Sequence, residues 1–265
     1  MTFDFGRNWK MFLKDFDISR LNEAKKDIQN FLGTKILSNK SFLDVGSGSG
    51  LSSLAARSLG AKVFSFDYNL DCVKCTQSLK FKFFNNDKNW KIIKGDVLDV
   101  NFIKSLGKFD IIYAWGVLHH TGNQWKSLRN LMHTCKVGTL LHLALYNDQG
   151  PESKRWLAIK KRYQKTPNFL KTLYVFYIYF PLEFRNFLYF CKIGRPSLYF
   201  KKIINYKKSR GMSYFYDMID WVGGYPFEVS KPENVVSFLK KNNFTIKKIK
   251  KNTGRGNNIF LAKKL

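Results

Sequence analysis

The sequence predicts an α/β protein with a mostly parallel sheet and a mainly helical insertion after the fifth strand. The first observation is an alternation of short apolar runs with segments of helical periodicity, which continues from residue 19 to residue 145. This β-α-β-α order is typical of a parallel sheet covered by helices on both faces. The second observation is that the alternation stops over residues 151–227 and resumes afterwards. We therefore assign residues 1–150 and 228–265 to one domain and residues 151–227 to an insertion.

Local signals support each element in turn. The first expected helix covers residues 19–31, where Ser19 is a candidate N-cap and apolar residues follow at helical spacing. Short apolar runs predict buried strands at residues 42–45, 62–66, 90–94, 109–115 and 139–145. Helices are expected at residues 51–59, 70–83 and 124–136, with a short helical piece before the fourth strand. After the insertion we expect a helix up to residue 241 and strands at residues 244–250 and 258–263.

Composition limits the class of protein. The chain has 265 residues, of which 45% are hydrophobic and 17% aromatic, so a substantial core is expected and disorder is not. Its four cysteines form no disulfide framework at this length, which favours a reducing, cytoplasmic location. Cys72 and Cys75 form a CxxC inside an expected helix with no second ligand pair nearby, so we expect no metal. The first residues carry charges throughout, and we expect no signal peptide.

The charge balance is strongly basic. Lys and Arg number 46 against 19 Asp and Glu, which gives a net charge of +27. Such an excess favours an anionic partner, namely nucleic acid, a membrane surface or a phosphorylated substrate. A compositional bias toward lysines that simply solvate the surface would give the same number, and both interpretations stay open. The insertion concentrates the charge, because residues 151–212 hold 15 Lys and Arg against two Glu.

The strongest local motif is Phe-Leu-Asp-Val-Gly-Ser-Gly-Ser-Gly at residues 42–50, a buried strand that enters a glycine-rich turn before a helix. Glycines at such a turn let a ligand lie against main-chain N–H groups without an intervening Cβ. A dinucleotide dehydrogenase would need Gly or Ala five residues after the first glycine, where this chain has Leu51. The dehydrogenase fingerprint is therefore absent.

The pattern D-x-G-x-G-x-G from Asp44 to Gly50 resembles motif I of the class I S-adenosylmethionine-dependent methyltransferases. Three later motifs also resemble this family: an Asp-Tyr pair after the second strand, Gly-Asp-Val after the third, and Trp-Gly-Val-Leu-His-His after the fourth. The resemblance implies a seven-stranded, Rossmann-like methyltransferase sheet with S-adenosylmethionine as cofactor. It further implies that the cofactor is bound by Asp44, Gly46, Ser47, Gly48, Gly50, Asp67, Tyr68, Asp96, Val97, Trp115 and Gly116.

Methyl transfer from a sulfonium is an in-line displacement, so the protein must align the nucleophile and remove a proton when the acceptor is a hydroxyl. His119 and His120 are the candidate bases, with His120 slightly favoured, because an imidazole titrates near neutrality. The alternative is that one of them only hydrogen-bonds a neighbouring backbone group. Tyr146 and Asn147 follow the fifth strand and are candidate substrate-binding residues.

The insertion is expected to form a lid over the acceptor, with Arg210, Tyr214 and Trp221 as further candidate substrate-binding residues. A simple packing role for this polar and aromatic cluster is the alternative. The apolar run at residues 173–182 is too short to span a bilayer, which needs ~20 apolar residues. It could pack within the lid, lie in a membrane interface or form an oligomer contact.

We therefore expect an enzyme that methylates a small-molecule, glycan-linked or lipid-linked acceptor, at an oxygen atom, with peripheral contact to the membrane surface as an open option. An RNA methyltransferase that uses the basic surface is the first alternative. The loop after the fourth strand lacks the Asn/Asp-Pro-Pro-Tyr/Phe motif of enzymes that methylate base amino groups, and no separate RNA-binding module is visible. A non-catalytic S-adenosylmethionine-binding protein is the second alternative, although both the glycines and Asp67 are retained.

Overall fold

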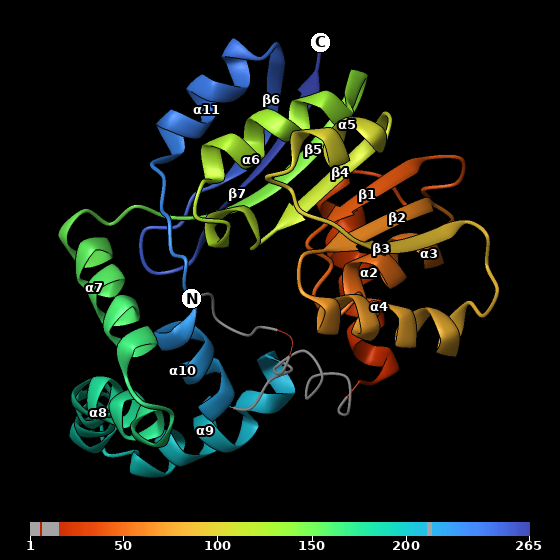
Figure 1. The fold of residues 1–265 in the computed structure, drawn as a ribbon. Coiled ribbons are helices and arrows are strands. Elements are labelled where there is room, and N and C mark those ends of the chain that lie inside the picture. Colours follow the sequence, from red (N-terminus) through yellow and green to blue (C-terminus); the bar gives the residue numbers. More distant parts are fainter. Residues whose placement is uncertain (1–5, 7–15, 211–213) are drawn as a thin grey trace. The chain divides into compact units, whose positions relative to one another are not determined.

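The computed structural model describes Gly6, residues 16–210 and residues 214–265, with only the backbone described for residues 207–210. The chain divides into two compact units. Among the described residues, one unit is Lys154–Tyr225, and the other contains Gly6, residues 16–153 and Pro226–Leu265. The second unit carries a seven-stranded sheet of order β3-β2-β1-β4-β5-β7-β6 (Figure 1). The predicted mostly parallel α/β sheet is confirmed.

The first five strands of the sheet are parallel, and β7 is antiparallel to both of its neighbours, β5 and β6. The strands are β1 Ser41–Val45, β2 Lys62–Asp67, β3 Trp90–Lys94, β4 Phe109–Trp115, β5 Cys135–Tyr146, β6 Phe244–Lys250 and β7 Asn257–Lys264. The fifth strand begins at Cys135, four residues before the predicted start. The hydroxyl of Thr139 accepts the N–H of Lys136 and donates to the carbonyl of Phe109, beside a register shift in the β4–β5 pair. Because the strand starts irregularly at residues 135–138, its apolar run in the sequence begins only at residue 139.

Helices cover both faces of the sheet in this unit (Figure 1). They are α2 Ile18–Leu32, α3 Leu51–Ser58, α4 Leu70–Phe83, α5 Val100–Ser105, α6 Gln124–Leu131 and α11 Pro232–Lys241, with the short 3-10 helices η1 Leu118–His120 and η2 Met132–Thr134. The prediction that Ser19 caps the first helix is wrong. The N-cap is Asp17, whose carboxylate accepts the N–H of Arg20, while the hydroxyl of Ser19 donates to the same carboxylate from inside the first turn.

Two apolar layers hold the helices to the sheet. One layer joins α5, α6 and α11 to the sheet through residues such as Ile112 and Leu128. The other joins α2, α3 and α4 to the opposite face through residues such as Ile111 and Leu54. Neighbouring residues of β4 serve opposite layers because side chains alternate across a strand. The carboxyl ends of β1 to β5 therefore lie along one sheet edge, supported from both sides.

The Lys154–Tyr225 unit is helical. Its helices are α7 Pro151–Lys165, which begins just before the unit, α8 Asn168–Lys192, α9 Pro196–Arg210 and α10 Tyr214–Gly223. Trp156 and Trp221 join α7 to α10 with ring centroids 5.4 Å apart, and the buried amine of Lys160 donates to the carbonyl of Trp221. Within the described ranges, no helix combines the length and apolar character needed to cross a bilayer.

Candidate active site

The turn between β1 and α3 has a shape that requires glycine. Gly46, Gly48 and Gly50 all have positive φ, at 69°, 54° and 84°. A Cβ on Gly46 would lie 2.2 Å from the side chain of Val117, and one on Gly50 would lie 2.8 Å from the backbone of Thr76. The hydroxyl of Ser47 lies 2.9 Å from that of Thr76 and fixes the turn to α4. The left-handed glycines thus let the turn at the carboxyl end of β1 pack tightly against Val117 and α4.

Asp67 ends β2 and faces this turn. One carboxylate oxygen accepts the N–H of Gly48 at 2.9 Å, and the other accepts the N–H of Asn69 at 2.8 Å. Burial raises the pKa of the Asp67 carboxyl above its ordinary value, although these N–H donors oppose the rise. The thiol of Cys72 and the N–H of Tyr68 also hydrogen-bond this carboxylate, which stays partly exposed at the end of β2.

Asp44 lies beneath the turn, with 2% of its surface exposed. Its carboxylate accepts the hydroxyl of Ser53 at 2.5 Å, which lies 2.6 Å from the hydroxyl of Ser65. Ser65 in turn accepts the indole N–H of Trp90 at 2.9 Å. Burial raises the pKa of Asp44 to about 7, with the Ser53 hydrogen bond opposing and the charge of Asp67 adding to the rise. The residue therefore closes a buried polar chain and is not an open ligand-binding side chain.

The loop after β3 lies beside the end of β2 and carries a further carboxylate, Asp96. The N–H of Gly95 donates to the carbonyl of Asp67 at 3.0 Å, which fixes this loop beside the end of β2. Asp96 is half-buried and one of its carboxylate oxygens accepts the N–H of Leu98 at 2.8 Å, while Val97 is 6% exposed. The ring of Tyr68, directly after Asp67, is 65% exposed. A planar group could therefore pack on this ring beside the Asp96 carboxylate.

The two histidines after β4 differ in their surroundings. His119 is fully buried, its Nδ1 accepts the N–H of Tyr146 at 3.2 Å, and its ring stacks on that of Tyr146 with centroids 3.7 Å apart. His119 thus hydrogen-bonds a backbone group, which was the alternative to a catalytic role, and so does His120. His120 is half-buried and its Nδ1 lies 2.6 Å from the carbonyl oxygen of Pro226. Because a carbonyl can only accept, Nδ1 of neutral His120 carries the proton and Nε2 carries the lone pair.

The residues after β5 are held by the surrounding structure. The ring of Tyr146 lies between those of His119 and Phe227, the latter with its centroid 5.4 Å away. The amide of Asn147 accepts from the side chain of Asn258 at 3.0 Å and donates to the carbonyl of Gly254 at 3.4 Å. The oxygen and the nitrogen of the Asn147 amide are therefore both used in hydrogen bonds that hold the end of β5 to β7 and the turn before it.

An aromatic cluster that sequence reasoning missed lies on the α2 side of β4 and β5. His142 is 3% exposed, with the ring of Phe31 stacked 3.9 Å away and those of Tyr113 and Trp115 at 4.9 and 5.4 Å. Neither ring nitrogen has a hydrogen-bond partner among the described residues, and burial lowers the pKa of His142 to about 3. Trp115 is 44% exposed, and the adjacent Gly116 has open space where a Cβ would lie. The sequence signal that could have revealed this cluster is His142 itself, a polar residue between Leu141 and Leu143 in an otherwise apolar strand.

The three candidates in the insertion belong to the helical unit. The backbone of Arg210 ends α9, and its side chain lies outside the described residues. Tyr214 begins α10, and burial together with a hydrogen bond to Glu183 raises the pKa of its hydroxyl. Trp221 packs on Trp156 and Lys160 within the unit. In the described part of the chain, no three His, Cys, Asp or Glu side chains gather as metal ligands would.

Residues 18–174, more than half of the chain, match the methyltransferase domain family. The chain belongs to this family. Together with the fold, this match makes it a class I methyltransferase that uses S-adenosylmethionine as methyl donor. The predicted family, enzyme class and cofactor are therefore confirmed.

Individual relatives differ in their acceptors. A region of 75 residues is 41% identical to ribosomal protein L11 methyltransferase of Prochlorococcus marinus (strain MIT 9515), and it spans 28% of this chain but only 21% of that protein. Magnesium protoporphyrin IX methyltransferase from Synechocystis PCC 6803, with bound S-adenosylhomocysteine, is 14% identical with a TM-score of 0.55 over 95% of this chain and 86% of that chain. PKMT2 from Rickettsia typhi is 15% identical with a TM-score of 0.55 over 85% of this chain and 49% of that one. These structural likenesses show the fold.

Proposed function

We propose that this methyltransferase transfers the methyl group to a hydroxyl of a small-molecule, glycan-linked or lipid-linked acceptor. The observation that carries the proposal is the hydrogen bond from His120 to the carbonyl of Pro226, because it leaves the Nε2 lone pair as the basic site of the ring. A hydroxyl is a weak nucleophile until its proton is removed, so a histidine base favours oxygen as the methylated atom.

The cofactor is proposed to lie across the carboxyl ends of β1, β2 and β3. Asp67 would accept the two ribose hydroxyls, Asp96 and Val97 would border the adenine, and the ring of Tyr68 would cover one adenine face. The methionine part would follow the turn from Gly46 to Gly50, with Ser47 inside it and Trp115 and Gly116 on the far side. The left-handed turn that requires Gly46 and Gly50, with the carboxylate of Asp67 bonded to the N–H of Gly48, supports this placement. Asp44, buried below, would support the turn.

When bound, S-adenosylmethionine supplies a methyl carbon activated by a positively charged sulfur. The chain then has two tasks, which are to orient the acceptor hydroxyl and to take its proton at Nε2 of His120. The carbonyl of Pro226 holds the ring in one orientation and stabilises the imidazolium through the Nδ1 proton. Tyr146, packed edge-on to the ring of His120 at 5.3 Å, limits its rotation.

The helical insertion is proposed to act as the lid that selects the acceptor, with Arg210, Tyr214 and Trp221 as its contacts. One observation within the sheet unit supports this role. Pro226 is the first residue after the Lys154–Tyr225 unit, and its carbonyl binds the proposed base. The N–H of Glu228 also donates to the carbonyl of His119 at 2.9 Å. The chain that returns from the insertion is therefore coupled directly to both histidines.

The test uses S-adenosylmethionine with a tritiated methyl group and an extract of the cells that make the protein, separated into small-molecule, lipid, glycan, RNA and protein fractions. We expect label in the small-molecule, lipid or glycan fraction as an oxygen-linked methyl group. Label confined to RNA or protein would overturn the acceptor class. Cofactor binding by calorimetry without labelling of any fraction would overturn catalysis itself.

A second variant tests the lid. Replacing residues 151–225 by a short glycine-serine linker should spare cofactor binding and abolish labelling, because Asp67 and the β1–α3 turn lie outside the deleted segment. Retained labelling of the same acceptor would overturn the lid assignment.

A further inference from the structure

Much of the exposed surface of α8 is apolar. The exposed positions recur every three or four residues, and most of them are large and hydrophobic. We call this set the α8 stripe; it consists of Phe169, Leu173, Phe176, Tyr177, Phe180, Phe184, Leu188 and Tyr189. Exposed fractions within it reach 81% for Phe169 and 75% for Tyr177, whereas Val175 is the buried residue of this helix.

This arrangement is the reverse of an ordinary surface helix, which turns its apolar face to the core and its charges to water. From residue 169 to residue 189 the stripe extends about 30 Å at 1.5 Å per helical residue. A continuous exposed apolar surface of this length indicates an interaction site. The aromatic members suit a boundary between an apolar phase and water, because their rings are broad and tyrosine keeps a polar end.

Positive charge predominates in the sequence that carries and follows the stripe. Residues 165–202 contain seven Lys and Arg and a single acid, Glu183. Glu183 is partly buried and accepts hydrogen bonds from Tyr199 and Asn186, both at 3.2 Å, so its charge is turned inward. The exposed cations are Lys165, Arg185, Lys192, Arg195, Lys201 and Lys202.

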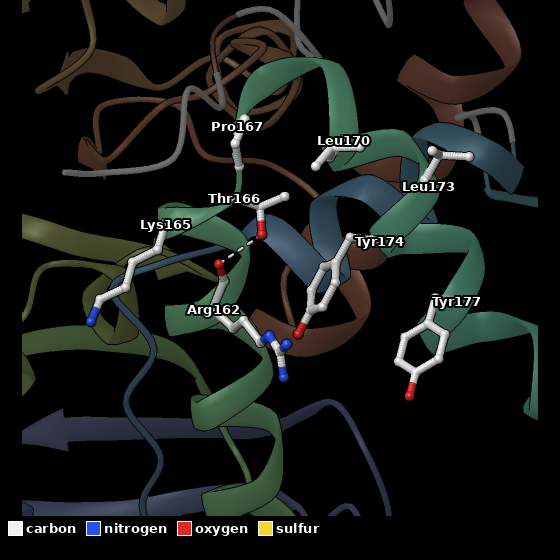
Figure 2. A pocket seen from close by; sticks show the side chains of 8 residues that line it. All are labelled: Arg162, Lys165, Thr166, Pro167, Leu170, Leu173, Tyr174 and Tyr177. Carbon is white, nitrogen blue, oxygen red and sulfur yellow. Dashed lines mark hydrogen bonds between the residues drawn. The ribbon is translucent and has the colours of Figure 1, made fainter.

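A groove of about 500 Å³ at the junction of α7 and α8 joins the two features. Figure 2 shows Arg162 and Lys165 extending from the end of α7, with Leu173 and Tyr177 on the α8 side. The last two residues also belong to the stripe, so the groove places guanidinium and ammonium groups next to an apolar wall that continues along α8. This chemistry fits a molecule with an anionic head and a hydrocarbon tail.

We propose that the α8 stripe lies in the surface of an anionic membrane, with the surrounding cations on lipid phosphates and one lipid headgroup in the groove. Helices that combine an apolar face with flanking Lys and Arg bind in the plane of such a surface. A second copy of this chain is a poorer occupant, because residues 154–225 carry 15 Lys and Arg against three Asp and Glu and would face like charge. The proposal stands independently of the acceptor and of the lid role.

The experiment is flotation of the full chain with two kinds of vesicle, pure phosphatidylcholine and phosphatidylcholine with one quarter phosphatidylglycerol. We expect flotation with the anionic vesicles, loss of flotation with neutral ones, and weaker binding as salt rises. The stripe variant Phe169→Gln/Leu173→Gln/Tyr177→Gln should stay unbound, and Lys201→Gln/Lys202→Gln should bind roughly fivefold more weakly per charge removed. All five side chains are exposed, so each variant should keep wild-type affinity for S-adenosylhomocysteine.

Matched controls come from the sheet unit. Phe81 is 72% exposed on α4, and Lys74 and Lys88 are exposed nearby in sequence. Phe81→Gln and Lys74→Gln/Lys88→Gln should float as the wild type does. Equal flotation with neutral vesicles, or wild-type flotation of the stripe variant, would overturn the proposal. So would a dimer in light scattering that the stripe variant abolishes, since a second copy would then be the occupant.

Discussion

The Nδ1 atom of His120 lies 2.6 Å from the carbonyl oxygen of Pro226, a residue 106 positions further along the chain. This contact fixes the tautomer of a half-buried imidazole after β4 and ties it to the segment that returns from the helical unit. The neighbouring His119 accepts a backbone N–H at its own Nδ1, so the two rings present opposite tautomers.

The first prediction separates these roles. Asn at position 120 can still donate to the Pro226 carbonyl but has no basic nitrogen, so His120→Asn should lower kcat by about 10²–10⁴-fold. The Kd for S-adenosylhomocysteine should stay unchanged in calorimetry. His133→Asn is the matched control, because that histidine is exposed in η2. Less than a threefold loss of kcat for His120→Asn would exclude it as the base.

Asp67 gives a second prediction, which needs no acceptor. Asp67→Ala should weaken S-adenosylhomocysteine binding by about 1.5–3 kcal/mol for each ribose hydrogen bond, less whatever water restores. Part of the loss would come from freeing the N–H groups of Gly48 and Asn69. Asp67→Asn keeps one acceptor oxygen and should lose less. Asp27→Ala, an exposed change on α2, is the control for charge. Wild-type affinity in Asp67→Ala would mean that the ribose lies elsewhere.

Asp44 provides a prediction for stability against pH. Burial raises its pKa from the ordinary 3.8 to about 7, so between these values the folded state binds more protons than the unfolded state. Stability should therefore fall as pH rises through this window, by about 1.4 kcal/mol per pH unit from this group. Asp44→Asn removes that term, so its stability relative to wild type should increase from pH 4 to pH 7 and level off above. Urea unfolding at several pH values checks this, and a constant difference would contradict it.

His142 should behave in the opposite direction. Burial lowers its pKa from 6.5 to about 3, so below pH 6.5 the unfolded state takes up a proton that the folded state does not, and stability falls with falling pH. His142→Phe removes two buried nitrogens that lack partners among the described residues, which should stabilise the protein by roughly 1–3 kcal/mol, more at pH 5 than at pH 8. His142→Ala should instead leave a cavity and destabilise. Thermal unfolding distinguishes the two variants, and a His142→Phe protein less stable than His142→Ala would refute the argument.

The glycines at the site allow a paired comparison. Gly46 and Gly116 have similar φ values, 69° and 71°, but a Cβ would meet Val117 at 2.2 Å in the first case and open space in the second. Gly116→Ala should cost about 1 kcal/mol of stability for its backbone conformation, and Gly46→Ala should cost clearly more because Val117 must move. Equal losses in chemical denaturation would show that the β1–α3 turn can adjust around a methyl group.

Much of the fold follows from local pattern. The alternation of strands and helices predicted the parallel sheet because each element carries its own apolar period, and the glycine turn marked the end of β1. Errors arose where two polar residues competed for one role. Asp17 and Ser19 both suit an N-cap, and Asp17 takes the role because its carboxylate accepts the N–H of Arg20, three residues along. At Cys135 the strand begins in residues without an apolar run.

The site was predicted less completely, because burial depends on contacts between distant segments. Asp44 lies in a motif that suggests an open ligand, yet Ser53, Ser65 and Trp90 enclose it from three other elements. His142 gained its surroundings from α2 and β4, which no local pattern around residue 142 reveals. The roles of the two histidines likewise depended on Tyr146 and Pro226.

The segment that leaves the sheet unit after β5 is hydrogen-bonded to the segment that returns to it before α11. Ser230 forms a parallel bridge with Asn147, donates its N–H to the carbonyl of Tyr146 at 3.0 Å and accepts the N–H of Asp148 at 3.3 Å. Because the ends of the excursion are already fastened, the length of chain between them adds little further closure cost to the sheet. We therefore expect that the intervening helices could be exchanged for another segment without disturbing the sheet. A related protein could carry a different segment at this point while the β1–α3 turn and Asp67 stay in place.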